Sequence, residues 1–280
     1  MVKYNKIKHV CFIADGHRSF ILLNNFNINR DIKDVYKYAY KSGAKALEKT
    51  IKMTFDRLHI RYLTTNAISR ENCIKRSLSG KTIASLIPYL FKERMLSYFI
   101  KNMVRVKFVG DIDLICSMAS DPDKLRKTIA EIEQLTSKFN KYNLIILTAF
   151  DPVHEYLKLM KNNKKDTIDK KILIRRYYGF DVPQVDFLIR TWWPRYSIIP
   201  ILVGEHADIY LFPAPMQAFK EKHYVKITKD YMDRITSTDS GDAYVKGVSK
   251  NLSSIKTKIL SADPLLTGIK INGVWMPFSK

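Results

Sequence analysis

Cysteine is scarce in this chain, which has only Cys11, Cys73 and Cys116 among its 280 residues. None belongs to a C-x-x-C pair or a Cys/His cluster, so the sequence encodes neither a disulfide framework nor a structural zinc site. Long apolar segments are also lacking, since no run approaches the roughly 18 to 20 residues that span a bilayer. The polar, basic N-terminus leads into Val10–Ala14, which is too short for the apolar part of a signal peptide. We therefore expect a cytoplasmic protein, soluble or peripheral to a membrane.

The common catalytic fingerprints are absent as well. The sequence contains no G-x-G-x-x-G that opens a helix, no G-x-x-x-x-G-K-[ST], no H-E-x-x-H and no G-x-S-x-G. The usual nucleotide-binding, zinc-protease and α/β-hydrolase interpretations therefore lose their main support.

Acidic residues are few relative to basic ones. The chain has 27 Asp and Glu against 48 Lys and Arg, a formal net charge of +21. Such an excess fits three classes of partner, namely nucleic acid, an anionic membrane surface and a phosphorylated small substrate. The lysines are spread along the chain, which is typical of a solvated basic face for most of them. Composition alone does not choose among the three classes.

Short apolar runs recur at distances that suit buried parallel strands separated by helices. The expected strands are His9–Ala14, His59–Thr64, Val104–Val109, Asn143–Thr148, Phe187–Thr191 and Ile209–Phe212. The expected helices between them are Asp34–Arg57, Ser85–Asn102, Asp123–Lys141 and Pro152–Met160. This alternation predicts an α/β fold, a single domain with about six mostly parallel strands flanked by helices. We place that domain at residues 1–219 and interpret residues 220–280 as a less regular C-terminal extension of unknown role.

Polar and charged side chains gather after three of these strands, where ligands bind in open parallel sheets. The clusters are Asp15–Phe20, Asn66–Arg76 and Asp186–Ser197, the last followed by Glu205–Asp208. An Asp next to a Gly suits a divalent metal and a closely approaching phosphate, and Arg side chains bind phosphate oxygens in pairs. Each cluster also has a plain structural explanation: an Asx turn, a polar turn that caps the next helix, and a basic interface loop.

In this order and spacing the clusters resemble the cis-prenyltransferases, the group of undecaprenyl and dehydrodolichyl diphosphate synthases. The resemblance runs from His9 to about Phe219. The matching segments are His9–Arg18 (H-[IV]-x-x-[IV]-M-D-G-N-x-R in the family), Lys41–Lys45 (H-x-x-G-x-x), Ser69–Asn72 (S-x-E-N), Val104–Asp111 (I-x-x-x-G-D/R) and Leu188–Ser197 (L-I-R-T-x-x-x-x-R-x-S).

The resemblance implies roles for individual residues. Asp15 would bind Mg²⁺ beside an allylic diphosphate, and Asp208 stands where the family has a Glu that helps to place the metal. Ser69 and Asn72 would lie near the reacting centre and assist proton removal. The residues expected to bind the substrate diphosphates are Gly16, His17, Arg18, Tyr40, Lys75, Arg190, Arg195 and Ser197.

The implied reaction is a Mg²⁺-dependent condensation of isopentenyl diphosphate with an allylic prenyl diphosphate, which forms a Z double bond. Mg²⁺ and the arginines would stabilise the departing diphosphate. An apolar product chain needs a tunnel, and the predicted helices supply Ile51, Met53, Phe55, Leu86, Ile87, Leu90, Phe91 and Leu96. The resemblance also implies a homodimer. Anionic substrates and peripheral contact with an anionic membrane then explain the positive net charge, and we expect no nucleic-acid partner.

Several positions depart from the family pattern: His17 replaces Asn, Ser19 replaces Arg, Tyr40 replaces His, Cys73 replaces Trp and Lys75 replaces Arg. The loop at Trp192–Pro194 is one residue shorter than the family's and lacks its Gly-Glu. These departures leave two alternatives open. One is a divergent prenyltransferase with head-to-middle regiochemistry or a different acceptor, and the other is a non-catalytic partner subunit of a heteromeric enzyme.

Overall fold

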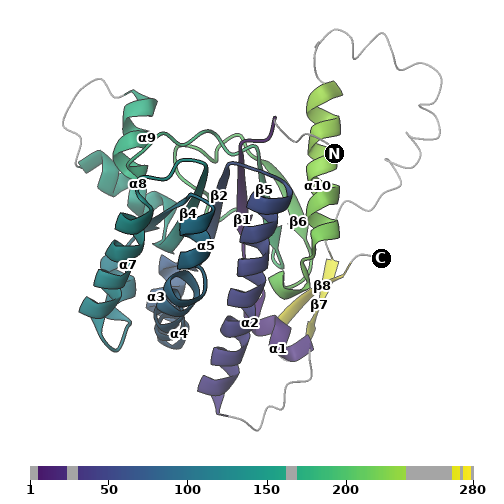
Figure 1. Cartoon of the computed structure of the whole chain (residues 1–280). Helices are drawn as coiled ribbons and strands as arrows, with labels where there is room; N and C mark the ends of the chain where they lie inside the picture. The colour runs from purple at the N-terminus through teal and green to yellow at the C-terminus, as the bar shows by residue number, and fades with distance from the viewer. Residues whose placement is uncertain (1–5, 24–30, 162–168, 238–266, 272–273, 279–280) are drawn as a thin grey trace. The chain divides into compact units, whose positions relative to one another are not determined.

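A computed structural model describes residues 6–23, 31–161, 169–237, 267–271 and 274–278 of the chain (Figure 1). The chain divides into two compact units, Met1–Glu221 and Lys222–Lys280, and each is described by itself. No helix among the described residues is long and apolar enough to cross a membrane.

The first unit is built on a six-stranded sheet in which every strand pair is parallel. The strands lie in the order β3-β4-β2-β1-β5-β6. Their bounds are β1 His9–Ile13, β2 Tyr62–Ser69, β3 Val104–Gly110, β4 Tyr142–Phe150, β5 Phe187–Thr191 and β6 Asp208–Phe212. The predicted α/β fold with six parallel strands is therefore confirmed.

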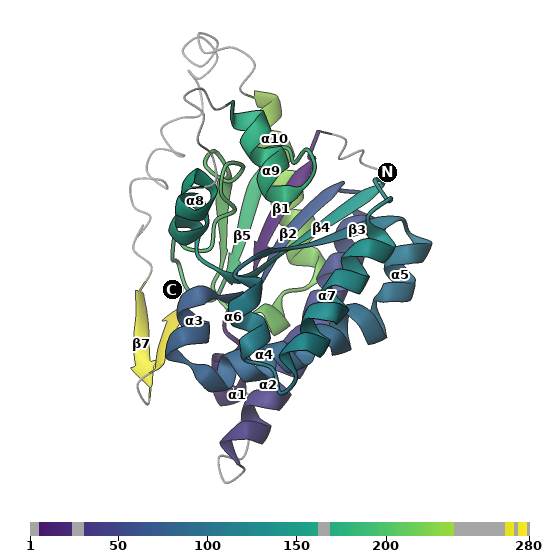
Figure 2. The same ribbon diagram turned by 90° about the vertical axis from the view of Figure 1, so that its left-hand side faces the viewer.

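Helices pack on both faces of this sheet (Figures 1 and 2). The α-helices of the first unit are α1 His17–Leu23, α2 Ile32–Lys52, α3 Arg70–Lys75, α4 Ser77–Ile87, α5 Leu96–Lys101, α6 Ile112–Ser117, α7 Pro122–Thr136, α8 Pro152–Lys161 and α9 Lys170–Tyr178. Three further helical segments are the π-helices η1 Met53–Arg57 and η2 Pro88–Arg94 and the 3₁₀-helix η3 Met216–Ala218.

The long helix α2 follows directly from its sequence pattern. The Asp31 side chain accepts a hydrogen bond from Lys33 N and caps the amino end. Buried residues then recur every fourth position, at Val35, Ala39, Gly43, Leu47 and Ile51. That spacing places one apolar stripe against the rest of the unit, as expected for an amphipathic helix.

One predicted helix is interrupted in the structure. The segment expected to be continuous from Ser85 to Asn102 instead consists of the end of α4, the π-helix η2 and α5. The change of hydrogen-bond pattern begins at Pro88, which has no N–H to donate to the preceding turn. The helix expected over Asp123–Lys141 ends earlier, at Thr136.

Some helices were not predicted at all. The six-residue helices α3 and α6 are too short to show a helical period in the sequence. Helix α1 begins at His17, where a loop was expected. Residues from 220 onward were expected to be irregular, but α10 covers Glu221–Ser237, so that interpretation was wrong for this stretch.

The described part of the second unit contains most of α10 and an antiparallel pair of strands. Strand β7 covers Thr267–Ile271 and β8 covers Val274–Phe278. The proposed boundary and the role of the C-terminal extension stay predictions.

Candidate active site

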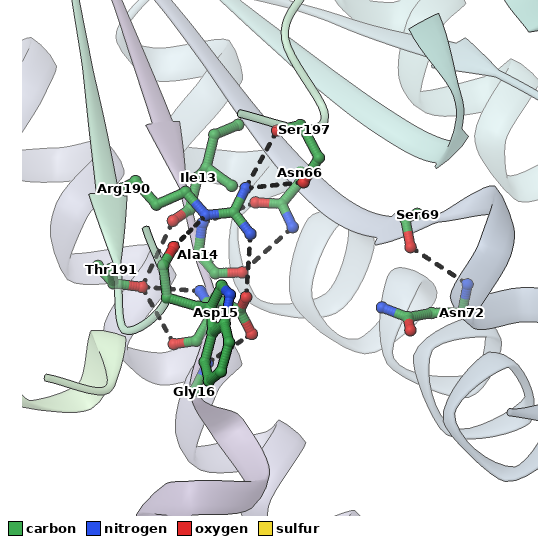
Figure 3. Close-up of polar contacts among 11 residues, drawn as sticks. Ile13, Ala14, Asp15, Gly16, Asn66, Ser69, Asn72, Arg190, Thr191 and Ser197 are labelled. Carbon is green, nitrogen blue, oxygen red and sulfur yellow. Dashed lines mark hydrogen bonds and ion pairs between the residues drawn. The ribbon is translucent and has the colours of Figure 1, made fainter. Parts of the chain in front are cut away.

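The carboxyl end of β1 is held in place by side chains from both neighbouring strands (Figure 3). From β2, Asn66 Oδ1 accepts a hydrogen bond from Ala14 N at 2.7 Å, and Asn66 Nδ2 donates to Ala14 O at 3.2 Å. From β5, Thr191 Oγ1 accepts from Asp15 N at 2.7 Å and donates to Asp15 O at 3.0 Å. Asn66 and Thr191 are buried. These bonds therefore fix the point at which the Asp15 side chain leaves the backbone.

Gly16 occupies a position that admits no other residue without distortion. Its φ is +87°, and a Cβ atom would lie 2.8 Å from Pro215 Cα and 3.0 Å from Trp192 Cβ. Without a side chain, Gly16 packs its backbone against these neighbours. Its N–H donates to Asp15 Oδ1 at 2.7 Å. We expected the Gly16 N–H to bind a substrate phosphate; in this structure it donates to Asp15 instead, and the role in phosphate binding stays a prediction.

Arg190 is the buried cation of the site, with 4% of its surface exposed. Its Nε donates to Trp193 O at 2.9 Å, and its Nη1 donates to the carbonyl and hydroxyl oxygens of Ser197 at 3.0 and 3.2 Å. Its Nη2 donates to Asp15 Oδ2 at 3.2 Å. Burial lowers the pKa of Arg190, and the Asp15 carboxylate opposes that shift. Arg190 therefore connects the loop after β5 to Asp15.

The loop after β5 also presents a second arginine to solvent. Trp192 is buried with a φ of +69°, an unusual left-handed conformation for a bulky residue. The guanidinium of Arg195 lies over the Trp193 ring, 4.9 Å from its centroid. Arg195 and Ser197 are exposed. Unlike Arg190, Arg195 can therefore turn toward an anionic ligand.

His17 begins α1, and its imidazole lies against α2. The ring centroids of His17 and Tyr40 are 5.2 Å apart, and Gln217 Nε2 lies 3.3 Å from His17 Nδ1. A Cβ atom on Gly43 would come within 2.4 Å of the imidazole, so the ring occupies space that only glycine leaves free. Burial lowers the pKa of His17 to about 4, although the Asp15 charge raises it. His17 is thus neutral near pH 7 and available for hydrogen bonding.

Tyr40 lies between His17 and α4 and is close to two cations. Its hydroxyl donates to Ser79 Oγ at 3.1 Å. Burial raises the pKa of Tyr40, while the Ser79 hydrogen bond and the charges of Arg18 and Arg76 lower it. Arg18 and Arg76 are both exposed. The charges of Arg18 and Arg76 thus both reach Tyr40, and the roles of Tyr40 and Arg18 in diphosphate binding stay predictions.

Lys75 does not join this group. Its Nζ pairs with Glu71 Oε1 at 2.8 Å in an exposed i,i+4 pair on α3. Arg76 is the cation near Tyr40, and it was not singled out from the sequence. The only sequence feature that pointed to Arg76 was its position directly after Lys75. That position does not show in which direction either side chain points.

Ser69 and Asn72 lie apart from the group around Asp15 in Figure 3. Ser69 is the N-cap of α3, and its Oγ accepts a hydrogen bond from Asn72 N at 3.2 Å. This is the capping turn that the plain structural explanation predicted. Among the described residues the Ser69 hydroxyl donates to no acceptor, so its hydrogen is available to a ligand.

Asp208 is not brought to Asp15 within this chain. It begins β6 and pairs with Phe187, whose other partner is Val10 on β1. Asp15 follows the opposite, carboxyl end of β1, about 16 Å further along at roughly 3.3 Å per residue. The expectation that Asp208 helps to place a metal beside Asp15 is therefore wrong for a single chain. No group of three His, Cys, Asp or Glu suited to a metal occurs among the described residues.

A narrow apolar pocket opens beside the site, between α2 and the α4–η2 segment. Its volume is about 50 Å³. Four of the predicted tunnel residues line it, namely Leu86, Ile87, Leu90 and Phe91. The other four, Ile51, Met53, Phe55 and Leu96, do not line it. The remaining lining residues are Ala14, His17, Tyr40, Gly43, Ala44, Leu47, Asn66, Ala67, Ile83 and Met216.

The site thus combines one carboxylate, three exposed arginines and an apolar pocket. Asp15 is half-buried, and the three exposed arginines are Arg18, Arg76 and Arg195. Such a set suits a ligand with an anionic head and an apolar tail, because the two ends meet chemically distinct surfaces.

Comparisons with known proteins agree on one family. A family model described as "Putative undecaprenyl diphosphate synthase" matches residues 27–238. A tritrans,polycis-undecaprenyl-diphosphate synthase (geranylgeranyl-diphosphate specific) from Thermococcus kodakarensis is 26% identical over 238 residues, 81% of this chain and 84% of that protein. An isoprenyl transferase from Thermotoga maritima is 25% identical over 235 residues, 81% of this chain and 94% of that protein.

Solved structures share the fold at lower identity. Lavandulyl diphosphate synthase from Lavandula x intermedia, in complex with dimethylallyl diphosphate, superposes with a TM-score of 0.64 at 18% identity, over 80% of this chain and 94% of that chain. A "probable undecaprenyl diphosphate synthase" from Campylobacter jejuni superposes with a TM-score of 0.60 at 21% identity, over 80% of this chain and 95% of that chain.

Proposed function

This chain belongs to the undecaprenyl diphosphate synthase family of prenyltransferases, and from that membership we propose that it condenses isopentenyl diphosphate with an allylic prenyl diphosphate to give a Z-prenyl diphosphate. The observation that carries the proposal is the Asp15 carboxylate. The backbone at Asp15 is fixed by Asn66 and Thr191. The carboxylate faces the Gly16 N–H and Arg190 and lies next to exposed arginines and an apolar pocket.

The residues present fit a Mg²⁺ ion that is shared with the substrate. Mg²⁺ commonly uses one or two carboxylates together with substrate phosphates and water rather than a closed protein site. Asp15 supplies one carboxylate, and no cluster of further acidic or imidazole ligands accompanies it among the described residues. Bound there, Mg²⁺ would neutralise negative charge on a diphosphate.

The chain's own cations would stabilise the departing diphosphate. We assign Arg18 and Arg76 to the allylic diphosphate. The charges of both arginines lower the pKa of Tyr40, which lies beside the pocket. We assign Arg195 and the Ser197 hydroxyl to the diphosphate of isopentenyl diphosphate. Arg190 mainly positions the loop, because most of its N–H donors are already engaged. Cations preorganised around the leaving oxygen favour the charge that develops as the carbon–oxygen bond breaks.

Bond formation then needs the isopentenyl alkene to attack that allylic carbon and to lose one proton. Ser69 has a hydroxyl hydrogen that no described residue accepts, and Asn72 follows one helical turn later. We propose that both bind isopentenyl diphosphate and hold it where the departing diphosphate accepts the proton. Since they lie apart from Asp15 in Figure 3, the two substrates would occupy the space between these groups.

The apolar tail would enter the pocket between α2 and α4–η2. At about 50 Å³ this pocket holds little more than one or two waters' share of liquid volume, about 30 Å³ each. Binding of a prenyl chain therefore requires the helices to separate. Residues Leu86 and Leu90 lie on the segment where α4 gives way to a π-helix, which is where we expect that movement.

The test uses the full chain with Mg²⁺, labelled isopentenyl diphosphate and allylic diphosphates of increasing length. We compare the wild type with Asp15→Asn and with Asp113→Asn, which changes an exposed carboxylate paired with Arg126. We expect product from the wild type and from Asp113→Asn, and at least a hundredfold loss of kcat in Asp15→Asn. Product NMR distinguishes a Z-linked chain from a head-to-middle product. No product with any starter would contradict the proposal and favour the partner-subunit alternative.

A homodimer and peripheral contact with an anionic membrane stay predictions from the family resemblance. Sedimentation of the purified chain and its flotation with anionic vesicles test them separately.

A further inference from the structure

A second concave site lies at the opposite edge of the sheet from Asp15. It is a cavity of about 740 Å³ at the amino ends of β1, β2 and β4 and beside α9. Figure 2 shows α9 at the end of the sheet where β1 begins, whereas α1 lies at the other end. The lining residues are Ile7, Lys8, His59, Arg61, Tyr62, Lys141, Tyr142, Lys171, Ile174, Arg175, Asp181, Val182 and Pro183.

The charge in this cavity is almost entirely positive. Its single carboxylate, Asp181, forms an ion pair with Arg175, whose Nη2 donates to Asp181 Oδ2 at 2.7 Å. The Arg175 hydrogen bond lowers the pKa of Asp181, so this carboxylate stays ionised and paired. The other basic side chains are Lys8, Arg61, Lys141 and Lys171, and no carboxylate in the described part of the chain forms an ion pair with any of them.

Two of these cations are held by contacts within the fold. Arg61 Nη2 donates to Asn140 O at 3.3 Å, and Lys141 Nζ lies 5.1 Å from the centroid of the Tyr142 ring. Each contact leaves further N–H groups for a ligand. His59 also lines the cavity and has a φ of +54°, a sparsely populated conformation that persists only where the surroundings impose it.

The floor of the cavity is apolar, because Ile7, Tyr142, Ile174 and Val182 are buried. A concave site of 300 to 1,000 Å³ with an apolar floor and a few converging polar groups is typical for a small molecule. Elsewhere in the described unit several cations are paired, as in Lys92–Glu131 and Lys107–Glu133. Unpaired like charges repel one another, and a bound polyanion removes that repulsion.

We propose that this basic cavity is a second ligand site, which binds a small polyphosphate anion, either free or as the phosphate chain of a nucleotide. Its phosphate oxygens contact Arg61 and Lys141, with Lys8 and Lys171 at the sides. The site shares no residue with the proposed prenyltransferase site, so it does not depend on the prenyltransfer reaction.

Isothermal titration of the full chain with sodium tripolyphosphate tests this site at one fixed salt concentration. The double variant Arg61→Gln/Lys141→Gln removes two cavity cations. The matched control, Lys101→Gln/Lys127→Gln, removes two exposed lysines that do not line the cavity. A third variant, Arg18→Gln/Arg195→Gln, removes cations of the proposed prenyltransferase site. Thermal unfolding confirms that all variants fold.

We expect the cavity variant to bind at least tenfold more weakly than the wild type. The control should retain wild-type affinity, and the Arg18/Arg195 variant should retain one binding event that the cavity variant lacks. Equal binding of the cavity variant and the control, or loss of all binding in the Arg18/Arg195 variant, overturns the proposal.

ATP, titrated in parallel, identifies the source of the phosphate chain. Tighter binding than tripolyphosphate assigns the cavity to a nucleotide, and equal binding assigns it to the phosphate chain alone. A single-stranded oligonucleotide that binds more tightly than either, through the same two residues, overturns the assignment to a small molecule.

Discussion

The placement of Asp15 depends on side chains that contact its backbone rather than its carboxylate. Thr191 contacts both the N–H and the carbonyl of Asp15, and Asn66 contacts the residue before it. Neither residue would touch a metal or a phosphate through these bonds. We therefore regard Asn66 and Thr191 as positioning residues for the proposed reaction.

Thr191→Val tests this role. The change keeps the side-chain shape but leaves the partly buried Asp15 N–H without its acceptor, a cost of about 1–3 kcal/mol. Because misplacement of a reacting group by about 1 Å can cost a hundredfold in rate, we expect kcat to fall about ten- to a hundredfold. Steady-state kinetics and urea unfolding of the same preparations measure both effects.

Thr65→Val is the matched control. Thr65 is also buried, on β2, but its Oγ1 has no hydrogen-bond partner. Removing an unpaired hydroxyl should leave kcat unchanged and should not lower the free energy of unfolding. Equal kinetic effects of the two changes would contradict a specific role for Thr191.

The sequence predicted the residue types at the site better than their contacts. Asp15, Gly16 and Arg190 come together at the ends of β1 and β5 because parallel strands end at the same edge. The bonds of Asn66 and Thr191 join residues 52 and 176 positions apart, which no local pattern reveals. The choice between Lys75 and Arg76 depends on which side of a short helix end each one faces, and this too needs the fold.

At the scale of elements, the approach of α1 to α2 depends on one glycine. Gly43 lies in the buried stripe of α2 and leaves room for the His17 imidazole. His17 and Gly43 both line the apolar pocket. The packing of these two helices therefore sets the shape of the pocket entrance.

Gly43→Ala should displace α1. The new Cβ would lie 2.4 Å from the His17 ring, so the ring and the start of α1 must move. Because His17 is two residues from Asp15, we expect KM for the allylic substrate to rise at least fivefold. Steady-state kinetics with that substrate varied will measure the change.

Gly80→Ala is the control for this change. Gly80 is also buried within a helix, but its Cβ would meet the flexible end of Met118, at 3.2 Å from Cγ. Alanine is favoured over glycine by about 1 kcal/mol in a helix interior. We expect stability to be unchanged or raised and KM to be unchanged. A rise in KM in both variants would show that helix stiffness, not the His17 contact, is responsible.

Elements with a clear apolar pattern were predicted well. Elements that depend on a capping residue or on a proline were not. Strand β4 is buried at every position and has four consecutive apolar residues, 144–147, at its centre. Helix α3 depends on the Ser69 cap and six residues, too few for a period. The sequence shows Pro88 but does not show that a π-helix begins there, because a Pro is also common near the start of an ordinary helix.

At the scale of the whole molecule, our proposals give the protein two separate places that bind anions. The arginines near Asp15 lie at the carboxyl edge of the sheet, and the basic cavity lies at the amino edge. The net charge of +21 indicated an anionic partner but could not distinguish one site from two.

The sheet as a whole should also be sensitive to acid, because a histidine is built into β1 without access to water. His9 is fully buried, with its Nδ1 2.8 Å from Pro183 O and its Nε2 2.8 Å from Thr64 Oγ1. The Tyr62 ring packs against it, and its backbone N–H donates to Asp186 Oδ2. Burial lowers the pKa of His9 to about 4 from its usual 6.5, despite the bond to Pro183.

This shift predicts how stability depends on pH. Above pH 6.5 His9 is neutral in both states and contributes no pH dependence. As the pH falls from about 6.5 to about 4, the unfolded chain binds a proton that the folded chain does not, so the free energy of unfolding falls. A difference of about 2.5 pKa units corresponds to about 3 kcal/mol at 1.36 kcal/mol per unit. His17 shifts in the same direction, whereas burial raises the pKa of Glu155 and acts in the opposite sense.

Urea unfolding across this pH range in three proteins isolates the His9 contribution from these other groups. His9→Asn removes the titrating group and should flatten the decline between pH 6.5 and 4, although it lowers stability at every pH by disturbing the buried bonds. His206→Asn replaces an exposed histidine and should follow the wild-type curve, offset by less than about 0.5 kcal/mol. If His9→Asn instead kept the full wild-type slope, the acid sensitivity of the fold would have to come from His17 or from the carboxylates, and the burial of His9 would not control it.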